Sequence, residues 1–327
     1  MRARAARLSR EVATLHIPDG FLGAPVAAAT WTVAAGGLAV ALRNERRDPN
    51  RFPAGILGSL AAFVFAAQMV NVPVAPGTSG HLVGATLVAL VVGPWRALVV
   101  MAVVLAVQAT LFQDGGFTSY GANLVDMGLA GTFVGYATAT WVARAVRGLR
   151  GLVVGGVAGA FAATLCGAVL ASAWLALSGL YPLGGILPLM LVTHSAIGVL
   201  EAALTGGILA TLVRWRPDLV AGPEGSGGPR RPGAVAFGTL GLALVVAAFL
   251  GPFASALPDG LEHTAHALGF AARARPLAPV PLEHAAFLTG ALGPWAPLAA
   301  GIAGTLLVAL VGWMAARGLG GGDVPHR

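Results

Sequence analysis

The sequence predicts an all-α integral membrane protein, with a bundle of seven helices followed by two C-terminal transmembrane helices. Of its 327 residues, 57% are hydrophobic and only 10% are charged, whereas soluble domains carry about 25% charged residues. The chain also contains apolar runs near the roughly 20 residues that cross a bilayer as a helix. Its 47 glycines suit helices that pack closely in lipid.

The apolar runs follow one another with short polar segments between them. The first seven lie at 21–42, 54–71, 81–93, 97–112, 121–143, 152–178 and 184–212. The third and fourth are short and are separated by Gly93-Pro94, where proline interrupts a helix. A polar linker rich in Gly and Pro, 217–232, precedes two further runs at 233–252 and 293–315.

Arginine placement predicts the orientation of these spans. The chain has no lysine, and arginines follow the first, third, fifth, seventh and ninth runs. With alternating spans these arginines fall on one side, which is then cytoplasmic, so the N-terminus is external and the C-terminus cytoplasmic. Arg273 and Arg275, and the arginine-rich segment 1–14, are exceptions. This pattern explains the net charge of +7 as membrane orientation, so we expect no nucleic-acid partner.

A polar turn, residues 15–22, directly precedes the first span. Pro18 and Gly20 prevent a regular helix, because Pro lacks an N–H and Gly frees φ. The turn therefore holds the imidazole of His16 and the carboxylate of Asp19 at the external membrane face. His16 is the first candidate metal ligand.

The loop Gly77-Thr78-Ser79-Gly80-His81 is expected on the same external side. Ser79 is predicted to cap the third span, with His81 in the first turn of that helix. The helix dipole would then favour the neutral imidazole that a metal requires. A capping loop with a hydrogen-bonded histidine is the alternative interpretation.

A third external loop contains Asp114 in a Gly-Gly turn and leads to Asn123 and Asp126. These side chains are candidates for orienting the metal-binding histidines, as metal sites usually require. A role in helix packing is equally compatible with the sequence.

His194 and Glu201 lie seven residues apart on one face of the seventh span. Ionisable groups inside a membrane are costly and usually functional. We expect a His194–Glu201 polar pair that holds helices together, with a metal-ligand role as the alternative.

After the eighth span, the loop carries Asp259 and Glu262 in the string Pro-Asp-Gly-Leu-Glu. Its histidines (His263, His266 and His284) are either weak metal contacts or incidental.

The segments HIPDG, GTSGH, FQDGG, HxxIGxxE and PDGLE occur in this order between Leu15 and Ala316. Together they resemble the CbiM/NikM family, the S components of nickel/cobalt energy-coupling-factor (ECF) transporters, fused to a small PDGLE-type (NikN/CbiN-like) component. The resemblance implies Ni²⁺ or Co²⁺ as transported substrate, with His16 and His81 as ligands. It also implies a transmembrane coupling (T/Q) subunit and two cytoplasmic ATPase (A/O) subunits as partners in the bilayer.

Family members begin with Met where this chain has Leu15. We therefore expect residues 1–14 to result from a start misassigned upstream, with residue 15 as the true N-terminus; a genuine extension is the alternative. If residue 15 is the terminus, its amine and the backbone and imidazole nitrogens of His16 offer three nitrogens in a plane. Tetragonal nitrogen sites suit Ni(II), and imidazole also suits Co(II). The expected segments are 1–14 (extension), 15–216 (metal-binding membrane domain), 217–232 (linker), 233–318 (two-helix module) and 319–327 (cytoplasmic tail).

Two other classes of function are compatible with parts of the sequence. An intramembrane hydrolase could place Ser79 or Ser195 beside a histidine, but the H-E-x-x-H motif is absent. A stand-alone secondary transporter should show inverted repeats, and none is evident. The chain has no phosphate-binding motif of the G-x-x-x-x-G-K-[ST] type. The sequence therefore predicts a protein that is not itself an enzyme and that depends on partner ATPases.

Overall fold

The computed structural model describes residues 16–48, 52–146, 148–220, 231–275 and 293–318. The described chain is almost entirely helical. The elements of its first part are α2 (Ala24–Arg47), α3 (Ala54–Gln68), β1 (Val72–Ala75), β2 (Thr78–Gly80), α4 (Ala85–Val92), α5 (Pro94–Val107), η1 (Gln108–Phe112), α6 (Tyr120–Asn123), η2 (Leu124–Val134), α7 (Gly135–Val146), α8 (Gly148–Leu177), α9 (Leu183–Trp215) and η3 (Pro217–Leu219).

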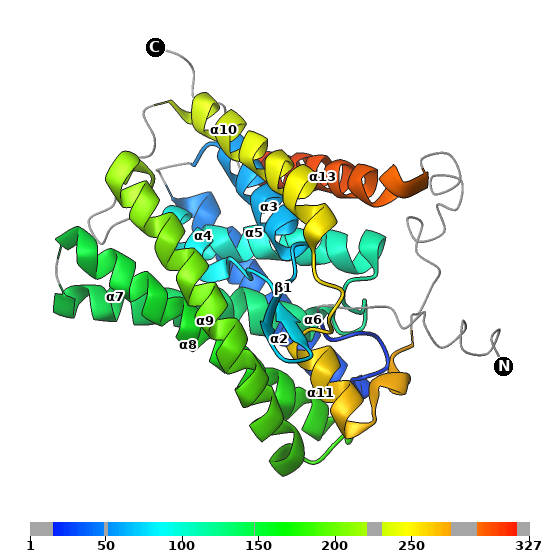
Figure 1. The fold of residues 1–327 in the computed structure, drawn as a ribbon. Coiled ribbons are helices and arrows are strands. Elements are labelled where there is room, and N and C mark those ends of the chain that lie inside the picture. The colour runs from blue at the N-terminus through cyan, green and yellow to red at the C-terminus, as the bar shows by residue number, and fades with distance from the viewer. Residues whose placement is uncertain (1–15, 49–51, 147, 221–230, 276–292, 319–327) are drawn as a thin grey trace.

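The second part of the chain contains fewer and mostly shorter elements. They are α10 (Pro232–Val245), η4 (Val246–Leu250), η5 (Gly251–Phe253), α11 (Gly260–Leu268), η6 (Ala271–Arg273), η7 (Gly293–Trp295) and α13 (Ala296–Gly318). The helices α10 and α13 both pack against α3, far from them in sequence (Figure 1). The short helix α11 instead lies beside α9 and the strand β2.

Six helical stretches in the described residues are long and apolar enough to cross a membrane. They are Ala24–Arg47, Pro94–Phe112, Arg150–Leu177, Leu183–Trp215, Pro232–Phe253 and Leu298–Gly318. The expected count of seven spans plus two is therefore not confirmed. The helix α3 has only 15 residues. The helix α4 has only eight, because Gly93, at φ +89°, and Pro94 end α4 and start α5.

Small residues allow α7 and α8 to pack closely. Gly151, Gly155 and Gly159 of α8 recur every four residues and face the backbone of α7; a Cβ on Gly151 would lie 2.8 Å from the carbonyl oxygen of Ala143. Such spacing brings helix backbones together in lipid, where dispersion contacts replace the hydrophobic effect. With α9 alongside α8, these three helices form one wall of the bundle (Figure 1).

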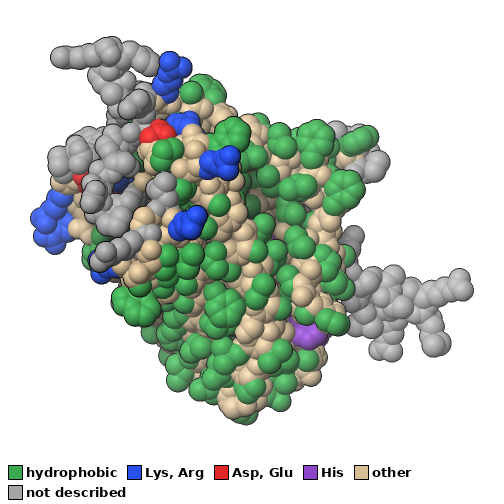
Figure 2. Space-filling view, turned by 60° about the vertical axis from the view of Figure 1, so that its left-hand side comes forward, with side chains coloured by type: hydrophobic (Ala, Val, Ile, Leu, Met, Phe, Trp, Pro, Cys, Tyr) green, Lys and Arg blue, Asp and Glu red, His purple; other side chains and the backbone are tan. Residues whose placement is uncertain are grey.

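The surface matches a protein that lies in a bilayer. Figure 2 shows hydrophobic side chains spread over most of this face, with the arginines gathered toward one end. Large apolar side chains are strongly exposed, among them Trp215, Phe237 and Phe253 at 74%, 78% and 84%. Exposed apolar area of this extent is rare on soluble monomers, so the surface supports a multi-pass membrane protein.

Candidate metal centre

The polar turn before α2 is buried and is held by the loop 113–119 and by α6. The backbone N–H of Ile17 donates to Oδ1 of Asn123 at 2.9 Å, and Nδ2 of Asn123 donates to the carbonyl of Ile17 at 3.1 Å. The N–H of Gly116 also donates to that carbonyl, at 2.9 Å. Asn123 thus fixes the backbone next to His16 and does not contact its ring by a hydrogen bond.

Asp19 stabilises the same turn. Its carboxylate accepts the backbone N–H of Phe117 at 3.2 Å, and it accepts both the backbone N–H (2.7 Å) and the hydroxyl of Thr118. Gly20 follows at φ +91°, a conformation that favours glycine. The hydrogen bonds of Asp19 show a structural role for its carboxylate at the base of the turn.

The imidazole of His16 is buried and is oriented by Asp114. Nδ1 of His16 lies 3.1 Å from Oδ1 of Asp114, whereas Nε2 is buried without a hydrogen-bond partner among the described residues. Burial by itself lowers the pKa of His16, but the charge and hydrogen bonds of Asp114 outweigh it and raise the pKa above 6.5. A proton on Nδ1, held by Asp114, leaves the Nε2 lone pair for a metal ion.

His81 lies next to His16 but not where the sequence predicted. It follows β2, and α4 begins only at Ala85, after Gly84 at φ +77°. The ring centroids of His16 and His81 are 6.0 Å apart, with the planes inclined at 76°. Burial, followed by the nearby His16, lowers the pKa of His81 to about 4. The imidazole is therefore neutral at pH 7, as the helix-dipole argument required, but for a different reason.

Ser79 does not cap α4, which corrects the prediction. It belongs to β2, and its hydroxyl donates to the carbonyl of Leu257 at 2.6 Å. The hydroxyl of Ser195 likewise donates to a backbone carbonyl, that of Leu191. These contacts give no support to either serine as a nucleophile paired with histidine.

The predicted pair between His194 and Glu201 does not form. Nδ1 of His194 lies 2.9 Å from the carbonyl of Met190, one turn earlier in α9. The carboxylate of Glu201 accepts the backbone N–H groups of Val83 and Gly84, at 2.6 and 2.9 Å. Two helical turns separate these side chains, so each finds a nearer partner. Glu201 instead holds the turn that carries His81.

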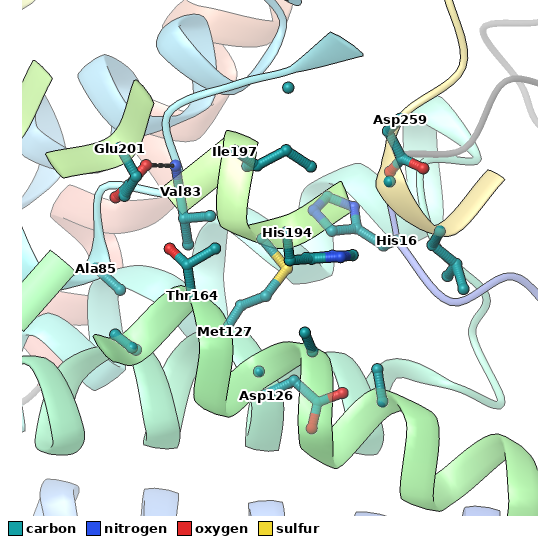
Figure 3. Close-up of a pocket in the computed structure, with 18 of the residues that line it drawn as sticks. His16, Val83, Ala85, Asp126, Met127, Thr164, His194, Ile197, Glu201 and Asp259 are labelled. Carbon is teal, nitrogen blue, oxygen red and sulfur yellow. Dashed lines mark hydrogen bonds between the residues drawn. The ribbon is translucent and has the colours of Figure 1, made fainter. Parts of the chain in front are cut away.

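One cavity of about 110 Å³ collects most of these groups. It is bordered by His16, His81, Asp126, His194, Glu201 and Asp259. Figure 3 shows the rings of His16 and His194 between Asp259 and Asp126 in that view. The volume exceeds what a single water needs, so the cavity has room for a metal ion with part of its hydration shell.

Asp126 does not orient a histidine by a hydrogen bond. Its Oδ1 accepts Nε1 of Trp174 on α8 at 2.8 Å, which agrees with the helix-packing alternative. Its Oδ2 is buried without a partner in the part of the chain that the structure describes. One carboxylate oxygen of Asp126 therefore accepts a hydrogen bond, whereas the other faces no donor among the described residues.

The C-terminal part of the chain closes one side of this cavity, which sequence reasoning missed. Asp259 and Gly260 border the cavity, and a Cβ on Gly260 would lie 2.8 Å from Cε1 of His194. The Pro-Asp-Gly string does indicate a helix start: Asp259 caps α11 by accepting the N–H of Glu262 at 2.7 Å. Burial raises the pKa of Asp259 to about 7, although that hydrogen bond acts in the opposite direction.

The other acidic and histidine side chains of this segment lie away from the cavity. The carboxylate of Glu262 lies 3.8 Å from Nε2 of His266, one turn later in α11. Nδ1 of His263 lies 3.0 Å from the carbonyl of Gly77. His284 and Leu15 lie outside the described residues.

Within the described ranges, no three His, Cys, Asp or Glu side chains form a complete metal cage. Three imidazoles, those of His16, His81 and His194, border one cavity, and His16 presents a nitrogen that no described residue satisfies. This arrangement supplies a partial set of nitrogen ligands that further donors must complete.

Comparisons with known proteins find similarity to metal-transport proteins. Residues 16–219 match the family model CbiM, described as the cobalt uptake substrate-specific transmembrane region. The chain is 30% identical over 321 residues to the "Putative fused nickel transport protein NikMN" of Archaeoglobus fulgidus, covering 93% of this chain and 98% of that protein. It is 36% identical over 232 residues to the cobalt transport protein CbiM of Geobacter sulfurreducens, covering 66% and 64% of the two chains. A crystal structure of a truncated transition metal transporter matches with a TM-score of 0.52 at 33% identity, covering 61% of this chain and 99% of that one.

Proposed function

The chain belongs to the CbiM family of cobalt uptake transmembrane proteins, and on this premise we propose that it is the substrate-specific component of an ECF-type importer. It captures Ni²⁺ or Co²⁺ on the external side of the cell membrane. The relatives fall in both groups: the Archaeoglobus protein carries a nickel-transport name and the Geobacter protein a cobalt-transport name. Imidazole accepts either ion.

The observation that carries the proposal is the meeting of two buried imidazoles in one cavity, with Nε2 of His16 unsatisfied by the residues described. Neutral imidazole nitrogens favour Ni²⁺, Co²⁺ and similar ions. Mg²⁺ and Ca²⁺ prefer oxygen ligands. A site built on His16 and His81 therefore selects transition metals from a solution rich in the other two.

The planar nitrogen set expected from the sequence needs Nδ1 of His16 to share a chelate ring with the backbone nitrogen, but Nδ1 faces Asp114. The remaining ligand in this proposal, beside Nε2 of His16 and the ring of His81, is therefore the amine at the start of the polar turn. The amine of residue 15, with a pKa near 7.7–8.0 when it is a chain terminus, deprotonates for a metal at modest cost. Around these ligands, Asp114 orients His16, Asn123 and Asp19 hold the turn, and Glu201 holds the turn at His81.

We assign the proposed importer the following organisation. Residues 15–216 form the metal-binding membrane domain, 217–232 a linker, 233–318 the PDGLE module and 319–327 a cytoplasmic tail, with the N-terminus external. A coupling T/Q subunit and two A/O ATPases supply the energy, since this chain has no phosphate-binding motif of the P-loop type.

Metal titration of the purified chain tests the ligand assignment. We expect His16→Ala and His81→Ala each to weaken Ni²⁺ or Co²⁺ binding by at least about 100-fold, since even loss of a group that orients a ligand costs 10–100-fold. His266→Ala, on the exposed face of α11, is the matched control and should bind as the wild type does. Equal affinity in His81→Ala and wild type would overturn the assignment.

Two further measurements separate the finer parts of the proposal. A chain that starts at residue 15 with Met should bind metal more tightly than the 327-residue chain, provided intact mass confirms both termini. Uptake into vesicles should require the ATPase subunits. Uptake by this chain alone would contradict the ECF assignment and favour a secondary transporter.

A further inference from the structure

The metal cavity continues well beyond the two histidines. Its border on α8 consists only of small residues on one helix face: Ala160, Ala163, Thr164, Gly167, Ala168 and Ala171. At 1.5 Å per residue this face extends along the helix for roughly 16 Å. Because no large side chain projects from it, the space that begins at His16 runs about three turns along α8 into the bundle.

Three carboxyl groups border this space, and they differ in how they are satisfied. Glu201 accepts two backbone N–H groups. Asp259 caps α11. Asp126 is 6% exposed and binds Trp174 through one oxygen, while its other oxygen has no donor among the residues that the structure describes.

This unsatisfied oxygen is a physical anomaly inside a membrane protein. A buried acceptor without a partner is costly, and an ionisable side chain within a bilayer usually marks a substrate pathway. Figure 3 places Asp126 across the cavity from Asp259, with His16 and His194 between them in that view. The carboxylate thus lies on the same route as the capture site but on the opposite wall.

We propose that Asp126 forms a second, weaker binding position for the transported divalent cation, which accepts the partly hydrated ion after it leaves His16 and His81. The inference rests on the proposed function. No three ionisable side chains of the described chain surround the position, so water completes the coordination. Ni²⁺ and Co²⁺ bind oxygen ligands less strongly than imidazoles, which suits a position from which the ion must depart.

Co²⁺ titration of the full chain in detergent, with equilibrium dialysis to count bound ions, tests this inference. Wild type should bind one ion tightly and a second weakly. Asp126→Asn keeps an oxygen acceptor for Trp174 but removes the charge, so it should keep the tight affinity within about two-fold and lose the weak phase. Trp174→Phe leaves the carboxylate in place and should retain both phases. Ser172→Ala, a buried change on the same helix outside the cavity, should also match wild type.

The outcomes distinguish this inference from the proposed function. A wild type without the tight phase refutes the proposed function. A wild type with the tight phase alone, or an Asp126→Asn protein with both phases unchanged, refutes only the second position. In His81→Ala the weak phase should persist, and adding Asp126→Asn should abolish it. Should Asp126→Asn fail to fold, anomalous diffraction from Co²⁺-soaked wild-type crystals decides: a peak at Oδ2 of Asp126 supports the position, and no peak there refutes it.

Discussion

Among single residues, His16 carries a free-energy cost, because one of its buried ring nitrogens has no partner among the described residues. Its unsatisfied Nε2 costs roughly 1–3 kcal/mol in an apolar setting. The contacts of Asp114 with Nδ1, and those of Asn123 with the neighbouring backbone, offset this cost and fix the ring. A metal ion at Nε2 removes the cost directly, so binding should also stabilise the folded protein.

The first prediction concerns pH. Metal binds only the neutral ring, so the metal affinity should rise with pH until the pH exceeds the pKa of His16. Asp114 raises this pKa above 6.5. Asp114→Asn removes this effect and leaves burial, which lowers the pKa, so the midpoint should move to lower pH. Calorimetric titration with Ni²⁺ between about pH 5.5 and 8.5 measures it. Asp218→Asn, at a surface pair with Arg216, is the control; an unmoved midpoint in Asp114→Asn would contradict the argument.

The second prediction concerns Glu201. An amide in its place has one oxygen, so Glu201→Gln leaves either Val83 or Gly84 without its acceptor. We expect a loss of about 1–3 kcal/mol in the free energy of unfolding, and weaker metal binding because the turn at His81 loosens. Thermal melting and metal titration of the same preparation measure both effects. A lower melting temperature with unchanged affinity would show that the turn does not depend on Glu201.

At this scale, the sequence predicted which polar residues lie near the cavity better than it predicted their hydrogen-bond partners. It brought His16 and His81 toward one site because both flank spans on one side. It failed for Ser79 and for the pair of His194 and Glu201, because helical spacing says which residues share a face but not which other element faces them. Glu201 accepts backbone N–H groups of the turn at Val83, and no residue type in that turn marks it in the sequence as a partner for a carboxylate.

At the scale of elements, glycine spacing determines how closely α7 and α8 approach. The glycines at 151, 155 and 159 face Ala143, Ala139 and Gly135 across the interface. These contacts set the position of α8, whose small face borders the cavity. The geometry of the proposed metal site therefore depends on an interface that contains neither of its two histidines.

The third prediction tests this interface. Gly155→Leu forces a large side chain into the backbone of α7 at Ala139, so α8 must move. We expect the free energy of unfolding to fall by at least the roughly 1–3 kcal/mol typical of overpacking. Metal binding should weaken as well. Gly207→Leu is the control, since a Cβ at Gly207 meets nothing within 4 Å. Equal melting temperatures for the two variants would contradict the close packing.

Apolar runs in the sequence located most helices but not their interruptions. Gly93-Pro94 correctly marked a break, whereas the strands β1 and β2 were not expected. This short hairpin, Val72 pairing with Gly80, turns at Gly77 with φ +75°. Its residues are few and have no alternating pattern, so a period-based reading assigns them to a loop. The π-helical segments, such as η2 with its 11 residues, also leave no mark on hydrophobic periodicity.

At the scale of the whole molecule, the C-terminal part contributes at two places. The helices α10 and α13 pack on α3, where a Cβ on Gly58 would lie 2.5 Å from the carbonyl of Ala309. The segment around α11 covers the metal cavity: the N–H of Ser79 donates to Pro258 at 2.8 Å, and that of Arg275 donates to Asp19 at 2.8 Å. Sequence resemblance suggested a second module but gave no contact between it and the site.

The fourth prediction tests this cover. A Cβ on Gly20 would collide with the carbonyl oxygen of Arg273, and φ of +91° is unfavourable for alanine. Gly20→Ala should therefore displace the segment near Arg273 and raise the metal dissociation rate several-fold. Stopped-flow release into a chelator measures the rate. Gly36→Ala, where a Cβ meets nothing within 4 Å, should release metal as wild type does; a similar rate in Gly20→Ala would show that the segment does not retain the ion.

The covalent link between the cavity and its cover fixes how the two meet. A cover on a separate polypeptide would occupy the cavity to an extent set by its abundance in the membrane. Here the segment around α11 belongs to the same chain as His16, so its effective concentration depends on the length of the connection and not on expression level. The contact between cover and cavity is then formed within one molecule, and every copy of the chain carries one cover in fixed proportion.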